Sequence, residues 1–321
     1  MGFVPSVHGR QVLNTYNYLS RSRRTPIETP AVLKELDLLA IAVDGAVAQV
    51  SLNRPAKRNA ISDVLITQLH TCFINLPQSV RVVVLRGEGE HFCAGLDLSE
   101  LAEHDIAGGI AHSRSWHAAF DAIQAGRVPV IAVLHGAVIG GGLELASAAH
   151  IRVAEDSAFY ALPEGQRGLF VGGGGSVRIP RLIGVSRMTD MMLTGRVLSA
   201  DEGHQAGLSS YRVAAGEGLP LALELAGRIA NNAPLSNFAV LQALPRISGL
   251  SQGDGLFVES LMAAVAQDDP AAKGRMRDFL AGKAEKVGKA QKGGKAQKGG
   301  KAQKGGKAQK GGDPKRGGEA Q

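Results

Sequence analysis

Apolar and polar residues along this chain follow first a strand-like and then a helix-like spacing. Residues 39–52 alternate around Asp44-Gly45, which predicts two short strands joined by a tight turn. The β-branched runs 82–85 and 130–133 predict buried strands, and residues 151–161 return to a strand pattern.

Helices are predicted between and after these strands. Residues 62–73 read as a helix capped by Ser62, with Val64, Leu65, Leu69 and Phe73 on one apolar face. Segments 99–125 and 143–149 also have a helical pattern, and helical spacing dominates from about residue 185 onward. Strands that alternate with helices, followed by helices alone, predict an α/β core with a helical appendage.

These patterns divide the chain into four parts. We expect a flexible lead-in over 1–37, an α/β core over 38–210, a helical region over 211–287 and a disordered tail over 288–321. The first 27 residues contain four arginines and no acidic residue. That composition resembles a transit peptide, so a targeting segment is the alternative to a flexible lead-in.

The positive charge of the chain belongs to its tail. The formal net charge is +7, but the twelve Lys and Arg and three Asp and Glu of residues 283–321 give that segment +9, which leaves −2 for the rest. A Lys-Ala-Gln-Lys-Gly-Gly unit repeats four times over 289–312. Because this segment cannot bury an apolar core, we interpret it as a solvated extension. Contact of its lysines with nucleic acid is the alternative.

The chain contains only two cysteines, Cys72 and Cys93. Two cysteines in a chain of this length exclude a disulfide framework and indicate a reducing, cytoplasmic setting. Cys93 could in principle be a nucleophile, but the sequence shows no partner base for it, so we interpret it as a packing residue. No apolar stretch has the length of a membrane-spanning helix, so no membrane association is expected.

Two glutamates beside glycine clusters are the strongest chemical signal. Glu144 lies within the run 140–146, Gly-Gly-Gly-Leu-Glu-Leu-Ala, and Glu164 follows Leu-Pro, shortly before the glycines of 172–175. Two carboxylates in one poorly hydrated pocket can divide proton transfers between them. The alternative is that Glu144 only favours the start of a helix and Glu164 lies in a surface loop.

Backbone N–H donors are expected near these carboxylates. The segment 91–98 follows one predicted strand, and the triple glycine follows another. Two strands that end in glycine loops can place two N–H groups side by side, where they stabilise an oxygen that gains negative charge. Gly141, the central glycine, is expected to need the backbone freedom of glycine.

At these residues the sequence resembles the enoyl-CoA hydratase/isomerase, or crotonase, family. The resemblance covers roughly residues 38–285, with the motifs in the order and spacing of the family. The matching stretches are 53–60, 91–98, 140–146, 162–164, 180–184 and 193–208.

The resemblance implies a fold and an assembly. Crotonases are built from stacked ββα turns, the architecture shared with ClpP, and carry a C-terminal helical trimerisation region. We therefore expect an α/β, crotonase-like core and a homotrimer, or a hexamer made of two trimers.

The resemblance also implies a chemistry. The acyl-CoA thioester oxygen would lie between the backbone N–H groups of Leu96 and Gly141. Glu144 and Glu164 would hold a water over the 2,3 double bond of a 2-enoyl-CoA and add it as enoyl-CoA hydratases do. Neither a metal nor a cofactor other than the coenzyme A of the substrate is implied. The positions that match coenzyme A contacts in the family are Ala56, Lys57, Arg58, Ala60, Ala94, Asp97, Phe279 and Lys283.

Other functions stay open at this point. The same residues are compatible with an enoyl-CoA isomerase or with a hydroxycinnamoyl-CoA (feruloyl-CoA) hydratase/lyase. Trp116 and Phe120 are four residues apart on a predicted helix, so they either line an aromatic acyl pocket or pack in the core. A function of another class would be a catalytically silent crotonase-fold protein that binds a partner through its basic tail.

Overall fold

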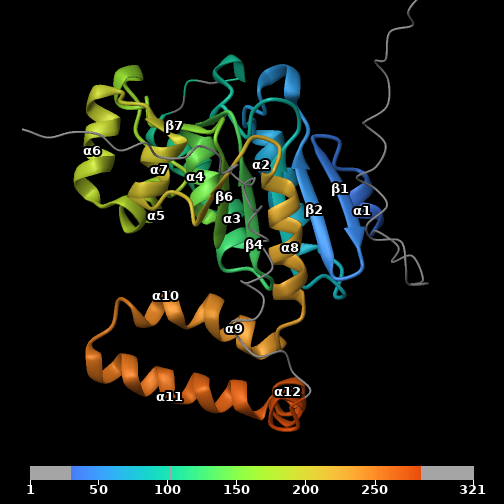
Figure 1. Cartoon of the computed structure of the whole chain (residues 1–321). Helices are drawn as coiled ribbons and strands as arrows, with labels where there is room; N and C mark the ends of the chain where they lie inside the picture. Colours follow the sequence, from blue (N-terminus) through green and yellow to red (C-terminus); the bar gives the residue numbers. More distant parts are fainter. Residues whose placement is uncertain (1–29, 101–102, 104, 283–321) are drawn as a thin grey trace, which may run out of the picture. The chain divides into compact units, whose positions relative to one another are not determined.

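The computed structural model of the chain describes residues 30–100, 103 and 105–282 (Figure 1). The predicted tail and nearly all of the predicted lead-in lie outside the described residues, and both stay predictions. The described chain begins with the short helix α1 (Ala31–Lys34). No helix in the described part of the chain is long and apolar enough to cross a membrane.

A six-stranded sheet forms the centre of the molecule, in the order β1-β2-β3-β4-β6-β9. The hairpin predicted around Asp44-Gly45 is confirmed, since β1 and β2 pair antiparallel and Gly45 has a φ of +60°. The other neighbours pair parallel. The strands of this sheet are β1 (Leu39–Asp44), β2 (Val47–Leu52), β3 (Val82–Gly87), β4 (Val130–Leu134), β6 (Ile151–Glu155) and β9 (Tyr211–Val213).

A second, three-stranded sheet has the order β5-β7-β8. The chain passes from the first sheet to the second right after β4, at Gly136, where φ is +53°. It does so again between β6 and β7, so the predicted strand 151–161 is two strands in two sheets. The strands of the second sheet are β5 (Ala137–Ile139), β7 (Phe159–Ala161) and β8 (Leu198–Ser199).

Three successive ββα turns stack on one another. The pairs β4–β5 and β6–β7 each lead into a helix, α4 (Gly141–Ala148) and α5 (Gly175–Ile183). The turn before them consists of β3, an isolated bridge from Cys93 to Val138, and α3 (Ile106–Gln124). The stacked ββα core expected from the resemblance is therefore confirmed.

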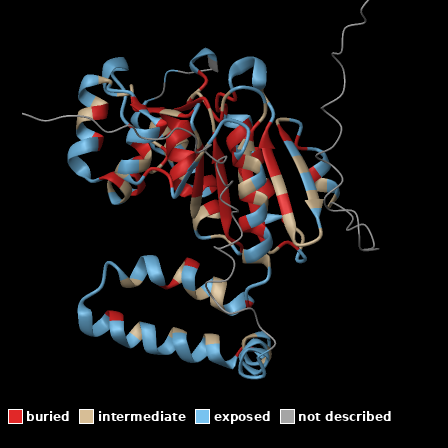
Figure 2. Cartoon of the chain, in the orientation of Figure 1, coloured by how far each residue is buried: buried red, intermediate tan, exposed pale blue. Residues whose placement is uncertain are grey.

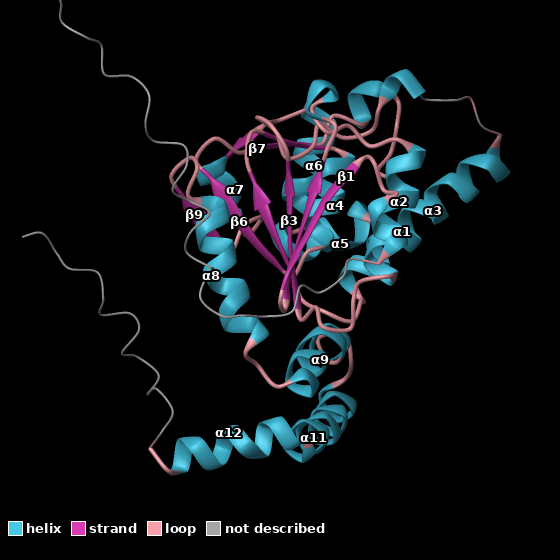
Figure 3. Cartoon of the chain, turned by 90° about the vertical axis from the view of Figure 1, so that its right-hand side faces the viewer, coloured by secondary structure: helices cyan, strands magenta, loops and turns pink. Residues whose placement is uncertain are grey.

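The central strands β3 and β4 are buried on both faces, as is typical of parallel strands. Alternate residues of β3 and β4 contact α8 (Gly218–Ala230) on one face, through a cluster that includes Ala222 and Ala226. The other face packs against α2 (Asp63–Ile74), α3 and α4 in the main core. Figure 3 shows α8 on one side of the strands and α2 and α3 on the other.

Two details correct the sequence interpretation. The Ser62 cap of α2 is confirmed, since its Oγ accepts the Leu65 N–H at 3.2 Å, but Val64 is 56% exposed and lies off the buried face. The buried face consists of Leu65, Leu69 and their neighbours, and Val64 is rotated about 100° from Leu65 around the helix. The core also extends past the expected boundary at residue 210, because β9 and α8 complete its sheet layer.

The chain continues as helices beyond α8. Those up to Lys273 belong to the same compact unit as the core, and a second unit begins at Gly274. Helix α11 is largely exposed, whereas α9 is partly buried (Figure 2). The remaining helices among the described residues are α6 (Val185–Thr194), α7 (Ala200–Ala206), α9 (Pro234–Gln242), α10 (Leu244–Ile247), α11 (Gln252–Asp268) and α12 (Pro270–Leu280), with 3-10 turns at Pro55–Lys57, Leu98–Glu100 and Gly165–Arg167.

Candidate active site

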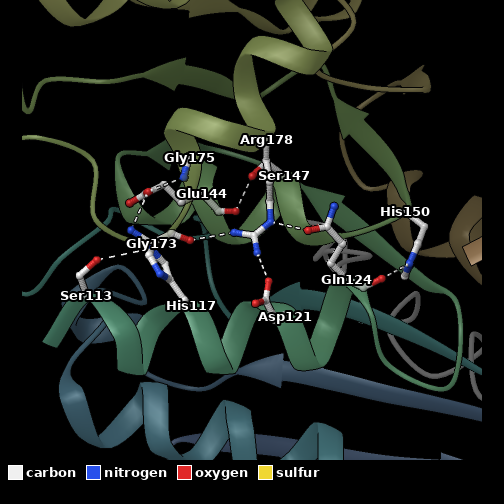
Figure 4. A network of polar contacts seen from close by, with 10 residues as sticks. All are labelled: Ser113, His117, Asp121, Gln124, Glu144, Ser147, His150, Gly173, Gly175 and Arg178. Carbon is white, nitrogen blue, oxygen red and sulfur yellow. Dashed lines mark hydrogen bonds and ion pairs between the residues drawn. The ribbon is translucent and has the colours of Figure 1, made fainter. Parts of the chain in front are cut away.

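Glu144 lies in the first turn of α4 and is only 3% exposed. Its Oε1 accepts the backbone N–H groups of Gly173 and Gly175, each at 2.8 Å (Figure 4). Both donors belong to the loop that starts α5, so the positive end of that helix faces the carboxylate. Glu144 is therefore a buried carboxylate whose ionised form is stabilised by backbone amides.

The two donors come from glycines that have no room for a side chain. A Cβ on Gly175 would lie 2.7 Å from Cγ of Glu144, and one on Gly173 would lie 2.9 Å from Cε2 of Phe120. Glycine at these positions lets the backbone approach the carboxylate closely.

Glu164 follows β7 and enters the same cavity beside Gly140. A Cβ on Gly140 would lie 2.6 Å from Oε1 of Glu164, and Gly140 has a φ of +52°. Oε2 of Glu164 is buried and has no hydrogen-bond partner among the described residues. This oxygen therefore lacks the amide donors that Oε1 of Glu144 has.

The two carboxyl groups differ in what stabilises their charge. Burial raises the pKa of Glu144 to about 7, although the N–H groups of Gly175 and Gly173 oppose the rise; the charge of Glu164 adds to it. Burial also raises the pKa of Glu164, against its own backbone N–H and the charge of Arg167. Two carboxyls in one cavity with such different surroundings can act as base and acid.

The predicted pair of N–H donors is brought together. A Cβ built on Gly141 would lie 3.6 Å from the backbone nitrogen of Leu96. Ile61 forms an isolated β-bridge beside Leu96. Its N–H donates to Gly95 O and its carbonyl accepts the Asp97 N–H, so the bridge does not use the Leu96 N–H. Gly141 is the first residue of α4, where a helix N–H has no partner within the helix.

The reason for glycine at position 141 differs from the expected one. Its φ is not positive, so backbone freedom is not what the position requires. Instead, a Cβ there would lie 2.7 Å from Cζ3 of Trp116. The indole ring of Trp116 therefore forms the wall beside this N–H.

A cavity of about 520 Å³ connects these groups. Helix α3 contributes one face to it, and Trp116 packs edge-to-face on Phe120 with ring centroids 5.6 Å apart. Trp116 thus both lines the cavity and packs in the core, whereas Phe120 is fully buried behind it. The cavity is lined by Ala94, Gly95, Leu96, Leu98, Glu103, Gly109, His112, Ser113, Trp116, Ile139, Gly140, Gly141, Glu144, Pro163, Glu164, Arg167, Leu169, Phe170, Val171, Gly172 and Gly173.

Five of the eight positions expected to contact coenzyme A lie in the segment 56–60 and at residue 94. Ala56, Lys57 and Arg58 are exposed beside the segment 91–98, which we call the oxyanion loop, and Lys57 Nζ donates to Ser99 Oγ at 3.2 Å. Ala94 lines the cavity, and Ala60 is buried.

Asp97, Phe279 and Lys283 are placed differently from these. Asp97 is 5% exposed, and its carboxylate accepts Arg54 Nη2 at 2.9 Å and Ser99 Oγ at 2.6 Å, which indicates a structural role for this side chain. Phe279 is exposed on α12, in the second unit of the chain, and Lys283 lies outside the described residues.

Sequence reasoning missed two residues that shape the oxyanion loop. Arg54 forms the ion pair with Asp97 and donates to Ala60 O at 2.6 Å. Asn59 is fully buried, and its Nδ2 donates to Glu88 O and His91 O at 2.9 and 2.7 Å. Asn59 has a φ of +57°, a conformation that asparagine adopts more readily than most residues. The available signal was that both residues lie in the stretch 53–60, which carries the family resemblance.

Cys93 belongs to the oxyanion loop and is fully buried. Burial raises the pKa of its thiol to about 12, so a thiolate nucleophile is not formed at neutral pH. The interpretation as a packing residue is confirmed.

Stacked ββα turns around a cavity with paired backbone donors define a crotonase-fold protein. The crystal structure of a "putative enoyl-CoA hydratase" from Rhodopseudomonas palustris CGA009 is 60% identical, with a TM-score of 0.76, over 78% of this chain and 96% of that one. A likewise named protein from Thermobifida fusca YX, solved in complex with acetoacetyl-CoA, is 27% identical with a TM-score of 0.66, over 74% of this chain and 96% of that one.

The sequence comparisons specify the family. The 2,3-dehydroadipyl-CoA hydratase of Escherichia coli (strain K12) is 33% identical over 258 residues, which cover 74% of this chain and 99% of the relative. The family model described as enoyl-CoA hydratase/isomerase matches residues 42–274. The chain belongs to the enoyl-CoA hydratase/isomerase family.

Proposed function

We propose that this protein is an enoyl-CoA hydratase, which adds water across the 2,3 double bond of a 2-enoyl-CoA thioester. One observation carries the proposal: Glu144 and Glu164 lie in one cavity with the backbone N–H groups of Leu96 and Gly141. An isomerase needs only one group that moves a proton, whereas a hydratase needs a base for water and an acid for carbon.

The thioester carbonyl would bind between the two N–H groups. As water adds to C3, the carbonyl oxygen gains enolate charge, which these donors stabilise. Loss of one such donor costs about 3–4 kcal/mol of transition-state stabilisation. Because both donors are backbone groups, the side chain of Leu96 has no chemical part in this step.

The surroundings of the two glutamates suggest how they divide the protons. Two backbone amides stabilise the charge of Glu144, which takes a proton from the water as the water oxygen bonds to C3. Glu164, whose Oε2 has no donor among the described residues, gives its proton to C2. The product is a 3-hydroxyacyl-CoA, and one proton then returns from Glu144 to Glu164 to restore the starting state.

Coenzyme A binding and assembly are further parts of the proposal. Ala56, Lys57, Arg58 and Ala94 would contact the coenzyme, with no other cofactor and no metal. The exposed apolar stripe Phe257, Leu261 and Val265 of α11 would be covered in a homotrimer, a state that light scattering can measure. The cytoplasmic location expected from the cysteine content stays a prediction.

The purified protein tests the proposal directly. Hydration of crotonyl-CoA removes the ultraviolet absorbance of the conjugated thioester, and feruloyl-CoA and a 3-enoyl-CoA are tested in parallel for the lyase and isomerase activities. Glu164→Gln is expected to lower kcat about 10²- to 10⁴-fold while thioester binding persists, because the acid is lost. Glu259→Gln, which removes an exposed carboxylate of α11, is the matched control.

Each outcome has a defined meaning. Near wild-type turnover in folded Glu164→Gln contradicts the two-glutamate mechanism. Turnover of the 3-enoyl-CoA alone would make the protein an isomerase. If nucleic-acid binding is the single activity found and deletion of residues 288–321 abolishes it, the silent binding protein is the correct alternative.

A further inference from the structure

Arg178 is a buried arginine of α5 that does not line the substrate cavity. Its side chain is 7% exposed, and three of its N–H groups have acceptors (Figure 4). Nη1 donates to Gly173 O at 2.8 Å, Nη2 to Asp121 Oδ1 at 2.6 Å and Nε to Gln124 Oε1 at 2.6 Å. Asp121 and Gln124 lie on α3, and Gly173 lies in the segment 172–175, which we call the glycine loop. The Arg178 side chain therefore connects α3 to the glycine loop.

The glycine loop is held at two points by side chains. Gly173 accepts from Arg178 through its carbonyl and donates to Glu144 through its N–H. One residue earlier, Gly172 O accepts Ser113 Oγ at 2.6 Å. Because glycines have no side chains to hold a loop in place, these contacts fix the direction of the N–H groups.

The packing at Gly174 also brings the Arg178 guanidinium into contact with the glycine loop. Its φ is +92°, and a Cβ there would collide with Nη1 of Arg178. The guanidinium therefore lies directly against the backbone that starts α5, and a side chain at this position would require the guanidinium to move.

Two charged side chains act on Glu144. Glu164 faces it from the loop after β7, and Arg178 faces it from α5. Asp121 offsets part of the Arg178 charge, and the exposed Arg181 of the same helix acts on Arg178 rather than on Glu144. Arg178 is thus the cation that acts on Glu144 from behind the glycine loop.

We propose that Arg178 is a positioning residue of this site: it holds the amides of Gly173 and Gly175 on the Glu144 carboxylate and so keeps Glu144 available as a base. The proposal rests on the hydratase function proposed above. It assigns Arg178 no contact with substrate.

The main test is the pH dependence of kcat/KM for crotonyl-CoA. Arg178→Gln removes the positive charge and the paired N–H donors of the guanidinium. The acidic limb of the pH profile, where kcat/KM falls as Glu144 is protonated, is therefore expected to move up by about one pH unit. Arg178→Lys keeps the charge but loses these paired donors, and a smaller upward shift is expected. Arg181→Gln, which removes an exposed cation of the same helix, is the matched control and should leave the limb in place.

A substitution on α3 is expected to shift the pH profile of kcat/KM in the opposite direction. Asp121→Asn removes a negative charge from a side chain that is 64% exposed, so folding should be preserved. The charge of Arg178 is then less compensated, and the acidic limb is expected to move to lower pH. This variant keeps the proposal falsifiable even if Arg178→Gln does not fold.

A second readout separates this proposal from the proposed function. Carbon-13 NMR of glutamate-labelled protein follows the titration of Glu144, with Glu144→Gln to assign the signal. Opposite shifts in Arg178→Gln and Asp121→Asn support the positioning role even in a protein without hydratase activity. An unmoved Glu144 titration in a folded Arg178→Gln or Arg178→Lys protein, with no shift in Asp121→Asn, overturns it.

Discussion

Replacement of Glu144 by glutamine should change how the stability of the protein depends on pH. Burial raises the pKa of Glu144 from an ordinary 4.5 to about 7 in the folded state. The folded protein therefore holds this proton more tightly than the unfolded chain. The resulting stabilisation is fully present below about pH 4.5, is lost as the pH rises to about 7, and stays lost above it.

The size of this change in unfolding free energy follows from the difference between the folded and unfolded pKa of Glu144. Each pH unit between the folded and unfolded pKa corresponds to about 1.36 kcal/mol, so the span from 4.5 to about 7 gives about 3 kcal/mol. Glutamine can accept both amide N–H groups through its Oε1 and carries no proton that titrates. Between about pH 4 and pH 8, Glu144→Gln should therefore gain about 3 kcal/mol of unfolding free energy relative to wild type.

Urea unfolding at a series of pH values measures this difference. Both proteins are compared at one fixed protein concentration, because an oligomer gains stability with concentration. Titration of groups distant from Glu144 cancels in the comparison, whereas Glu164 is coupled to Glu144 and contributes to the difference. Glu259→Gln controls for the loss of a surface charge. A difference in unfolding free energy that stays flat across this range would refute the assignment of Glu144 as a buried carboxyl with a raised pKa.

The remaining predictions concern activity and local packing. For wild type, kcat/KM should fall about tenfold per pH unit below pH about 7, because Glu144 must be ionised to act as a base; a rate that is flat down to pH 5 contradicts that role. Gly175→Ala should lower kcat at least about tenfold in a folded protein, because its methyl would lie 2.7 Å from Cγ and 2.8 Å from Oε1 of Glu144. The matched change Gly227→Ala, on an exposed and open face of α8, should leave kcat unchanged and raise the unfolding free energy by about 0.5–1 kcal/mol.

The sequence by itself determined the local elements and the chemistry they carry. Apolar runs located β3 and β4, since strands buried on both faces must be apolar throughout. Ser62 marked the start of α2, because serine is a favoured N-cap residue whose hydroxyl accepts a backbone N–H of the first turn. The glycine-flanked Glu144 and Glu164 were identified from residue type and from resemblance to a family.

Contacts distant in the chain were decided by the tertiary structure alone. The amides on Glu144 come from residues 29 and 31 positions later, and no local pattern pairs them with it. The Trp116 wall at Gly141 and the Arg178 anchor under the glycine loop arise in the same way, when α3 and α5 pack beside α4. Periodicity reports which face of an element is apolar, but the partner of a buried polar group depends on how the elements assemble.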